Sequence, residues 1–184
     1  MKARYQLAVT LAFTVLQLCK TNWLDNSWSK EDIYFIKGGN TSFAEDLYVR
    51  KPDVTVKDTS QSVLPAGLRP WSNPSLFALA VIFLELYFGR PIESIPDSPT
   101  DLDPAGNPWP HGFTEFLKVS RLADEIDLGI REKEEFYFKA IERCLKCNFD
   151  TRTLDLENER FQELFYLEVI APLQKCYDLI NTIM

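Results

Sequence analysis

Carboxylates, hydroxyls and a lysine are concentrated between Asn22 and Ile36, in the segment NWLDNSWSKEDIYFI. The segment follows a strongly apolar run and ends in an apolar tail that is typical of a short strand. Asp25 and Asp32 carry oxygen ligands of the kind that divalent cations prefer. The same side chains also suit the capping of turns in a solvated loop. We favour capping and therefore expect no metal site. The alternative is a divalent-cation site with Asp25 and Asp32 as ligands.

Helices are expected to position this segment. Apolar residues recur at helical spacing over 3–19, and residues 75–88 are apolar on nearly every side. We therefore expect 75–88 to cross the centre of the domain, with Ser75 as its N-cap. Three further helices are expected near the C-terminal end, over residues 113–127, 132–147 and 157–183, the last bent or broken at Pro172.

The remaining segments read as short strands and long connections. Strands are expected near 33–37 and 47–56, and Pro-rich connections over about 57–74 and 91–112. The sequence thus predicts one mainly α domain that spans residues 1–184.

The charge of the chain limits its partners. The formal net charge is −7 and basic residues form no cluster, which argues against binding to a phosphate backbone. Glu85 interrupts the most apolar run, so we expect no membrane span.

The cysteines are expected to be structural. Cys19, Cys144 and Cys176 lie in apolar helical patterns, which favours buried thiols over disulfides. Cys144 and Cys147 form a C-x-x-C pair, but His111, the one histidine of the chain, lies in a distant Pro-rich segment. A zinc site is therefore not expected.

The N-terminal run allows two interpretations. Lys2 and Arg4 precede an apolar stretch, as in a secretory signal, but a clear cleavage site does not follow. We favour a retained helix in a cytoplasmic protein. The alternative is a secreted protein that loses residues 1–19, and only there does the sequon at Asn40 matter.

The order of these parts resembles the C-terminal lobe of a protein kinase. LDNSWSKEDIYF is similar in length and apolar tail to the kinase catalytic loop HRDLKPENILL. SLFALAVIFLELYFGRPI resembles the central kinase helix, with matches at Glu85 and at Gly89-Arg90-Pro91. AIERCLKCNFDTR is similar to the penultimate kinase helix and the turn after it, where Arg152 matches.

The combination of the first helix, the TNWL and SWSKEDIYFI segments and the central helix resembles a fungal kinase-like domain of unknown function. Members of that family occur alone or behind prion-inhibition-and-propagation, HeLo-type domains. The resemblance implies a kinase-like fold and a fungal source, and it implies no established activity.

The kinase register does not preserve the catalytic residues. When Ile33 is aligned with the apolar tail, Asp32 takes the metal-binding position and Ser27 that of the catalytic Asp. Asp25 and Asn26 then stand at the His and Arg positions. A serine hydroxyl cannot accept a proton at neutral pH as a carboxylate does.

Other parts of a kinase are missing from the sequence. D-F-G does not occur, and the resemblance provides no Gly-rich loop or N-terminal lobe within this chain. We therefore expect no autonomous enzyme activity and no cofactor.

Several further residues are expected to be structural. Glu85 lies in an apolar helix and requires a partner, for which Arg90 and Arg152 are the candidates. Lys30 is expected to be surface charge. The carboxylates of the second Pro-rich connection are expected to be solvated, namely Asp97, Asp101 and Asp103.

Aromatic residues mark surfaces where a partner can bind. Trp23 and Trp28 flank the degenerate catalytic loop, as buried anchors or as part of an interface. Trp71, Trp109 and Phe113 lie near the Pro-rich connections, where aromatic side chains often anchor interfaces.

Three hypotheses follow for the function. The first is a non-catalytic, pseudokinase-like module that binds a protein partner or associates with itself. The second is a secreted, effector-like protein, and the third is a phosphotransferase fragment that another chain completes.

Overall fold

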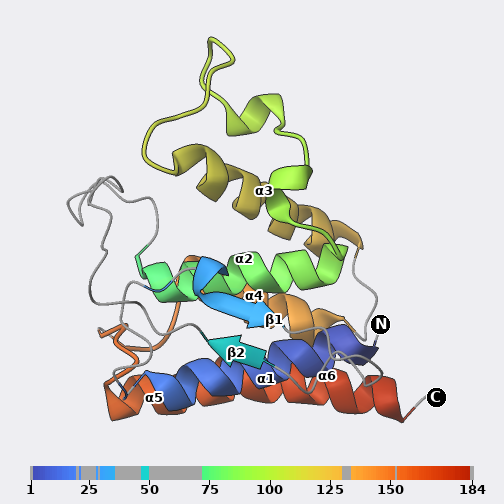
Figure 1. Ribbon diagram of the computed structural model, residues 1–184, viewed down its shortest axis with the longest axis vertical. Helices are drawn as coiled ribbons and strands as arrows, with labels where there is room; N and C mark the ends of the chain where they lie inside the picture. The colour runs from blue at the N-terminus through green and yellow to red at the C-terminus, as the bar shows by residue number, and fades with distance from the viewer. Residues whose placement is uncertain are drawn as a thin grey trace.

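The computed structural model describes residues 2–19, 21, 28, 30–35, 47–49, 72–129, 134–151 and 153–182. Helices dominate this described part of the chain (Figure 1), so the prediction of a mainly α fold is confirmed. None of the helices within it is both long enough and apolar enough to cross a membrane.

The central helix is α2 (Pro74–Phe88), and its residues from Ser75 to Leu84 are all buried. Its N-cap is Asn73 rather than Ser75, because Pro74 fits the first helical position, where a missing N–H costs nothing. The Asn73 side chain accepts a hydrogen bond from the backbone N–H of Leu76 at 3.0 Å. The predicted central helix is confirmed.

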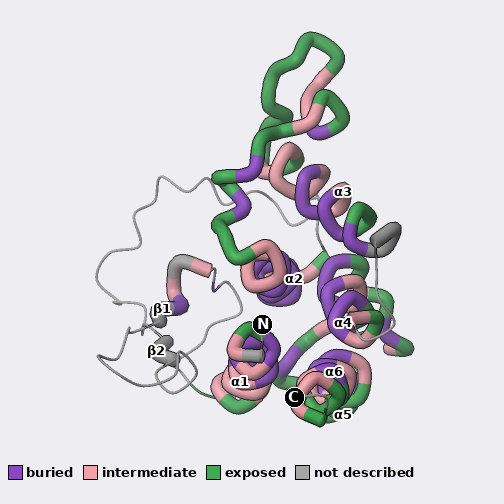
Figure 2. The backbone as a smooth tube through the Cα atoms, turned by 90° about the vertical axis from the view of Figure 1, so that its right-hand side faces the viewer, coloured by how far each residue is buried: buried purple, intermediate pink, exposed green. Residues whose placement is uncertain are grey.

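Three further helices complete the core: α1 (Lys2–Leu18), α4 (Glu135–Lys146) and α6 (Ala171–Asn181). Helices α1 and α4 pack on α2, and α6 packs on α1 and α4. Figure 2 shows these helices nearly end-on, with α1 and α4 each beside both α2 and α6, and with α4 and α6 on the side away from the sheet. Leu11, Ala12 and Val15 of α1 are almost completely buried. Helix α1 thus packs on the central helix and contributes to the core.

A hydrogen bond between buried groups joins two of these helices. The hydroxyl of Tyr137, on α4, donates to the backbone carbonyl of Phe83, on α2, at 2.8 Å. Both side chains are fully buried, so the bond satisfies a polar group that would otherwise be costly to bury.

The last helical stretch is interrupted, as the proline predicts. It runs as α5 (Glu159–Phe165), the π-helix η5 (Tyr166–Ile170) and then α6. Pro172 has no N–H to donate to the carbonyl of Glu168, so a regular α-helical ladder cannot continue there. The backbone N–H of Ala171 bonds instead to the carbonyl of Tyr166, five residues earlier.

A small antiparallel sheet lies beside α1 and α2. Strand β1 (Ile33–Phe35) pairs with β2 (Leu47–Val49), with Ile33 opposite Val49. The 3-10 helix η1 (Lys30–Asp32) directly precedes β1. Both strands fall where the sequence predicts them, and the predicted continuation of the second to residue 56 lies outside the described residues.

Residues 95–112, which we call the arm, extend away from the helical core and return to α3 (Phe113–Gly129), as Figure 1 shows. The 3-10 helix η3 (Ile92–Ser94) leads into the arm, and η4 (Pro99–Asp101) lies within it. Helix α3 packs on α2 and α4 and supports the arm.

The four cysteines are reduced thiols, and Cys19, Cys144 and Cys176 are buried. This confirms the prediction from their apolar surroundings. Burial raises the pKa of the Cys147 thiol to about 11, although a backbone hydrogen bond from Asn73 acts in the opposite direction. The pair is thus protonated at neutral pH, since burial also raises the pKa of Cys144.

Candidate functional site

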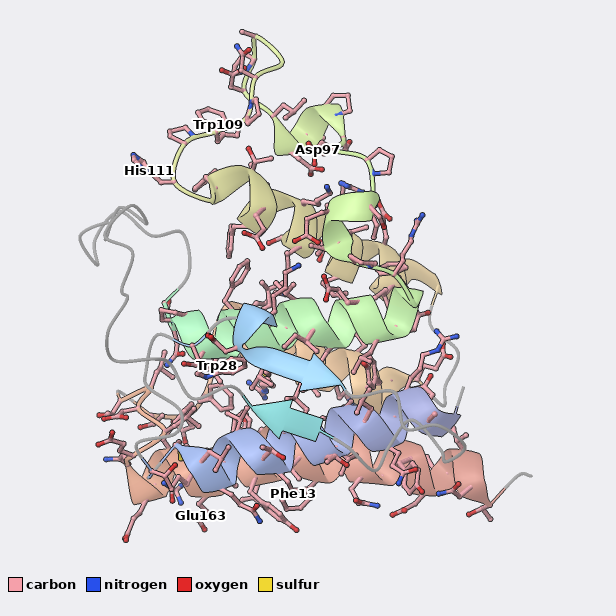
Figure 3. The ribbon with its side chains drawn as sticks, viewed as in Figure 1. Phe13, Trp28, Asp97, Trp109, His111 and Glu163 are labelled. Carbon is pink, nitrogen blue, oxygen red and sulfur yellow. The ribbon has the colours of Figure 1, made fainter. Side chains whose placement is uncertain are left out.

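The segment from Asn22 to Ile36 lies only partly within the described residues. Asp25, Asn26 and Ser27 fall outside them, as does Trp23. Asp32 is the half-buried last residue of η1. The indole of Trp28 lies close to α2 in Figure 3 and is only 4% exposed, so its prediction as a buried anchor is confirmed.

Lys30, which precedes Asp32 by two residues, connects this loop to the central helix. Its Nζ lies 2.8 Å from Oε1 of Glu85 and also bonds to Oε1 of Glu93. The same Glu85 oxygen accepts a hydrogen bond from the backbone N–H of Ile92 at 2.9 Å. We call Lys30, Glu85 and Glu93 the lysine clamp.

The lysine clamp corrects two expectations. Lys30 is a half-buried ion-pair partner, not plain surface charge, and Lys30 rather than Arg90 meets Glu85. Arg90 is exposed because it follows Gly89, whose left-handed backbone (φ 69°) ends the helix and turns the chain away. The other proposed partner, Arg152, lies outside the described residues.

The electrostatics of the clamp hold the Lys30 amine in its charged form. Burial alone disfavours the ammonium ion, but hydrogen bonds to Glu85 and Glu93 raise the pKa of Lys30 above its usual value. The Lys30 amine therefore already binds two carboxylates.

Metal-ligating side chains do not converge in the described part of the chain, where no group of three or more His, Cys, Asp or Glu residues can hold an ion. His111 is exposed on the arm, as Figure 3 shows.

The arm is fixed to α3 by two ion pairs. Arg121 binds Asp101 through both Nε and Nη2 at 2.8–3.1 Å, and the Asp101 side chain is only 1% exposed. Lys118 Nζ lies 2.6 Å from Oδ1 of Asp97. The expectation that these carboxylates are solvated is wrong for Asp101, because α3 places two cations directly beneath the arm.

Asp101 also organises the backbone of η4. Its Oδ2 accepts the backbone N–H of Ser98 at 2.8 Å. Burial opposes ionisation of this carboxyl, but the hydrogen bonds from Arg121 and Ser98 prevail and lower its pKa. The carboxylate is therefore a fixed, charged structural group.

Short-range hydrogen bonds shape the outer part of the arm. Oδ1 of Asp103 accepts the backbone N–H groups of Ala105 and Asn107, at 2.9 and 2.7 Å. The backbone N–H of Trp109 donates to Oγ1 of Thr114 at 2.6 Å. These bonds fix the position from which the Trp109 side chain projects.

Aromatic rings lead from the arm to the core. Trp109 and Phe113 are 38% and 39% exposed, with ring centroids 6.0 Å apart in an edge-to-face arrangement. Phe113 contacts Phe116 at 6.2 Å, and Phe116 contacts the buried ring of Phe77 at 6.0 Å. We call Trp109, Phe113 and Phe116 the aromatic track.

The aromatic track ends at a groove of about 390 Å³ between α3 and α4. Phe116, on the track, is one of the apolar residues that line it, with Ala123, Phe138 and Leu145. Asp124 and Glu142 add carboxylates, and Lys146, bonded to Glu142 at 2.7 Å, also contributes. The sequence points to Trp109 and Phe113, but the groove depends on how two helices meet.

Three of the residues that shape this region are missing from the sequence interpretation: Lys118, Arg121 and Asp124. A signal for the first two exists, since residues three apart on a helix share a face and the preceding connection is acidic. The remaining predicted interface residue, Trp71, lies outside the described residues.

Comparison with known proteins gives one result for nearly the whole chain. The model of the family described as "Domain of unknown function (DUF7580)" matches residues 1–179. No curated protein and no solved structure matches the chain. The match covers both the helical core and the arm, and the chain therefore belongs to the DUF7580 family.

Proposed function

We propose that the protein is a non-catalytic interaction module with a fold similar to a kinase C-terminal lobe, of the kind expected in a fungal pseudokinase. The order of elements supports this: a first helix, a loop with a short strand pair, a buried central helix and then further helices. The proposal retains α1 in the folded protein, because its Leu11 and Val15 fill the core. A protein that keeps this helix is proposed to be cytoplasmic and not secreted.

The absence of catalysis is part of the proposal. Ser27 stands where phosphoryl transfer needs a carboxylate, and D-F-G does not occur in the sequence. The neighbouring lysine amine is engaged by Glu85 and Glu93. These features favour a structural role for this loop over a phosphotransferase site that another chain completes.

The observation that carries the interaction role is the exposed pair of Trp109 and Phe113 on a fixed support. A folded chain gains by burying large aromatic side chains, and an exposed pair on a rigid loop is typical of a binding anchor. The ion pairs of Asp97 and Asp101 hold this pair outward before any partner arrives.

The proposal is tested by affinity capture with the intact chain and with a Trp109→Ala/Phe113→Ala double variant. We expect at least one protein to bind the native chain and to be lost from the double variant. Tyr166→Ala is the matched control, because Tyr166 is 45% exposed but packs on Phe13 at the other end of the molecule (Figure 3). Identical captures by native and double-variant chains would contradict the interaction role.

The non-catalytic part needs its own measurement. We expect Mg-ATP to leave the thermal unfolding midpoint of the chain unchanged, because ligands that bind the folded state raise that midpoint. A rise that Asp32→Ala abolishes would instead support a phosphotransferase fragment.

A further inference from the structure

We propose that the aromatic track and the adjoining groove bind a basic segment of a partner protein in which arginine lies next to an apolar residue. The proposal rests on the interaction function above and names the class of partner. Three independent features of the surface carry it: its charge, its exposed rings and the shape of the groove.

The charge around the arm is strongly negative. Residues 95–125 hold six acidic and two basic side chains, a net charge of −4 within a chain whose total is −7. Both basic side chains are occupied within the molecule, Lys118 by Asp97 and Arg121 by Asp101 and Glu125. A partner therefore meets exposed carboxylates such as Asp124, and a cationic segment complements them.

The exposed rings favour arginine as that cation. Trp109 is 38% exposed beside Phe113, and a guanidinium group stacks on indole rings while it keeps its hydrogen-bond donors available. Lysine is a compact, strongly hydrated charge that cannot stack in this way. An acidic surface with an exposed tryptophan is thus more complementary to arginine than to lysine.

The groove explains the need for an apolar neighbour. The aromatic track reaches it through Phe116, and its other apolar walls come from α3 and α4. Its volume of about 390 Å³ is in the range of pockets that hold side chains or small ligands. An aliphatic side chain can fill it while Asp124, at its edge, pairs with an adjacent cation.

Among the described residues, the one cation that lines the groove already has a partner. Lys146 lines the groove, but its amine is bonded to Glu142 one helical turn away. Asp124 remains exposed on α3. Within the described residues, the edge of the groove therefore carries the ion pair of Lys146 with Glu142 and the exposed carboxylate of Asp124.

The test is a titration of the intact, isotopically labelled chain with a short synthetic peptide in which arginine alternates with leucine, followed by NMR. We expect saturable shifts of the Trp109 indole N–H and of amides in α3 and α4 around Phe116 and Asp124. Matched peptides replace every arginine by lysine or by glutamate. We expect weaker binding of the lysine peptide and no binding of the glutamate peptide.

Two exposed substitutions localise the site. Trp109→Ala is expected to weaken binding of the arginine peptide about fivefold, as for loss of one partly exposed cation–π contact. Asp124→Asn is expected to weaken it about threefold at low salt, since a surface ion pair contributes little. Tyr166→Ala and Glu159→Gln, an exposed carboxylate on α5, are the controls and should leave binding unchanged. Thermal unfolding of each variant confirms that the fold is retained.

The outcomes separate the two proposals. Equal binding of the glutamate peptide or of a neutral proline-rich peptide, or no binding of the arginine peptide, overturns the arginine-containing partner. If affinity capture still depends on Trp109 and Phe113 in that case, the interaction function stands with a partner of another class. If capture is also independent of these residues, both proposals fail.

Discussion

The helical core and the arm are stabilised in opposite ways. In the core, α2 is buried on almost every side and neighbouring helices contribute fully buried side chains such as Leu11 and Tyr137. In the arm, few side chains are buried, and ion pairs to Lys118 and Arg121 hold the backbone in place. The core thus depends on apolar area, and the arm depends on charge and turn geometry.

This difference explains which part of the molecule can bind a partner. A core that needs its apolar side chains for stability has none to spare for binding. An arm that is fixed by polar contacts can leave Trp109 and Phe113 exposed. The following substitutions test the division, from the largest expected loss of stability to the smallest.

Phe83→Ala removes a fully buried ring from α2 and should be the most damaging change. Truncation of a buried phenylalanine costs about 4 kcal/mol, because it loses apolar burial and leaves a cavity. Urea unfolding followed by circular dichroism measures this loss. A cost below about 1 kcal/mol would show that the core is not packed around α2 as described.

Asp101→Ala leaves Arg121 without its bidentate partner and frees the backbone N–H of Ser98. Loss of one partner of a buried pair costs about 3 kcal/mol. We expect faster amide hydrogen exchange in the arm and at the start of α3, with slow exchange retained in α2. Uniform loosening of both regions would contradict the separate stabilisation of core and arm.

Acid should affect the arm through the same carboxylate. The folded-state pKa of Asp101 lies below its ordinary value of about 4. Its contribution is therefore fully present above about pH 4 and is lost as the pH falls through the lowered folded-state pKa. Urea midpoints of the native chain and of Asp101→Asn should differ near neutral pH and converge in strong acid. A constant difference across the titration would exclude this linkage.

Lys30→Met tests the lysine clamp between η1 and the central helix. The side chains of Lys30 and Glu85 are 18% and 21% exposed, so water screens them partly, and we expect a loss of about 1 kcal/mol. Glu85→Gln should cost a similar amount, whereas Glu93→Gln should cost less because Glu93 is 62% exposed. The reverse order would show that Glu93 is the dominant partner.

Trp109→Ala should change stability least, within about 0.5 kcal/mol, because surface substitutions rarely cost more. The same change should weaken binding of the arginine peptide about fivefold. A substantial loss of stability would identify Trp109 as part of the fold and not as an exposed anchor.

The sequence predicts the core better than the arm, for a physical reason. Residues 75–88 are so apolar that only a central position can bury them, and the end of this helix at Gly89 follows from local chemistry. The N-cap is Asn73 and not the predicted Ser75. Pro172 likewise marks the interruption of the last helical stretch, although the π-helix begins six residues earlier. Periodicity and backbone chemistry suffice for such features.

The ion pairs could not be inferred from the sequence in the same way, since each joins elements that are distant along the chain. Lys30 and Glu85 are 55 residues apart, and Asp101 and Arg121 are 20 apart. Charged residues in a Pro-rich segment usually face water, so the buried state of Asp101 needs the position of α3. The groove between α3 and α4 has the same origin, because neither helix alone forms it.

The π-helix has a consequence for the number of residues that this fold can accommodate. Each residue turns an α-helix by about 100°, so an inserted or deleted residue rotates everything that follows by that angle. If the same sequence were wound as a regular α-helix from α5 to its end, a different side of α6 would face α1, with Leu173 and Cys176 rotated out of the core. The wide turn thus adjusts the rotation between α5 and α6, so that Phe161 on one side of it and Leu173 on the other both lie in the core.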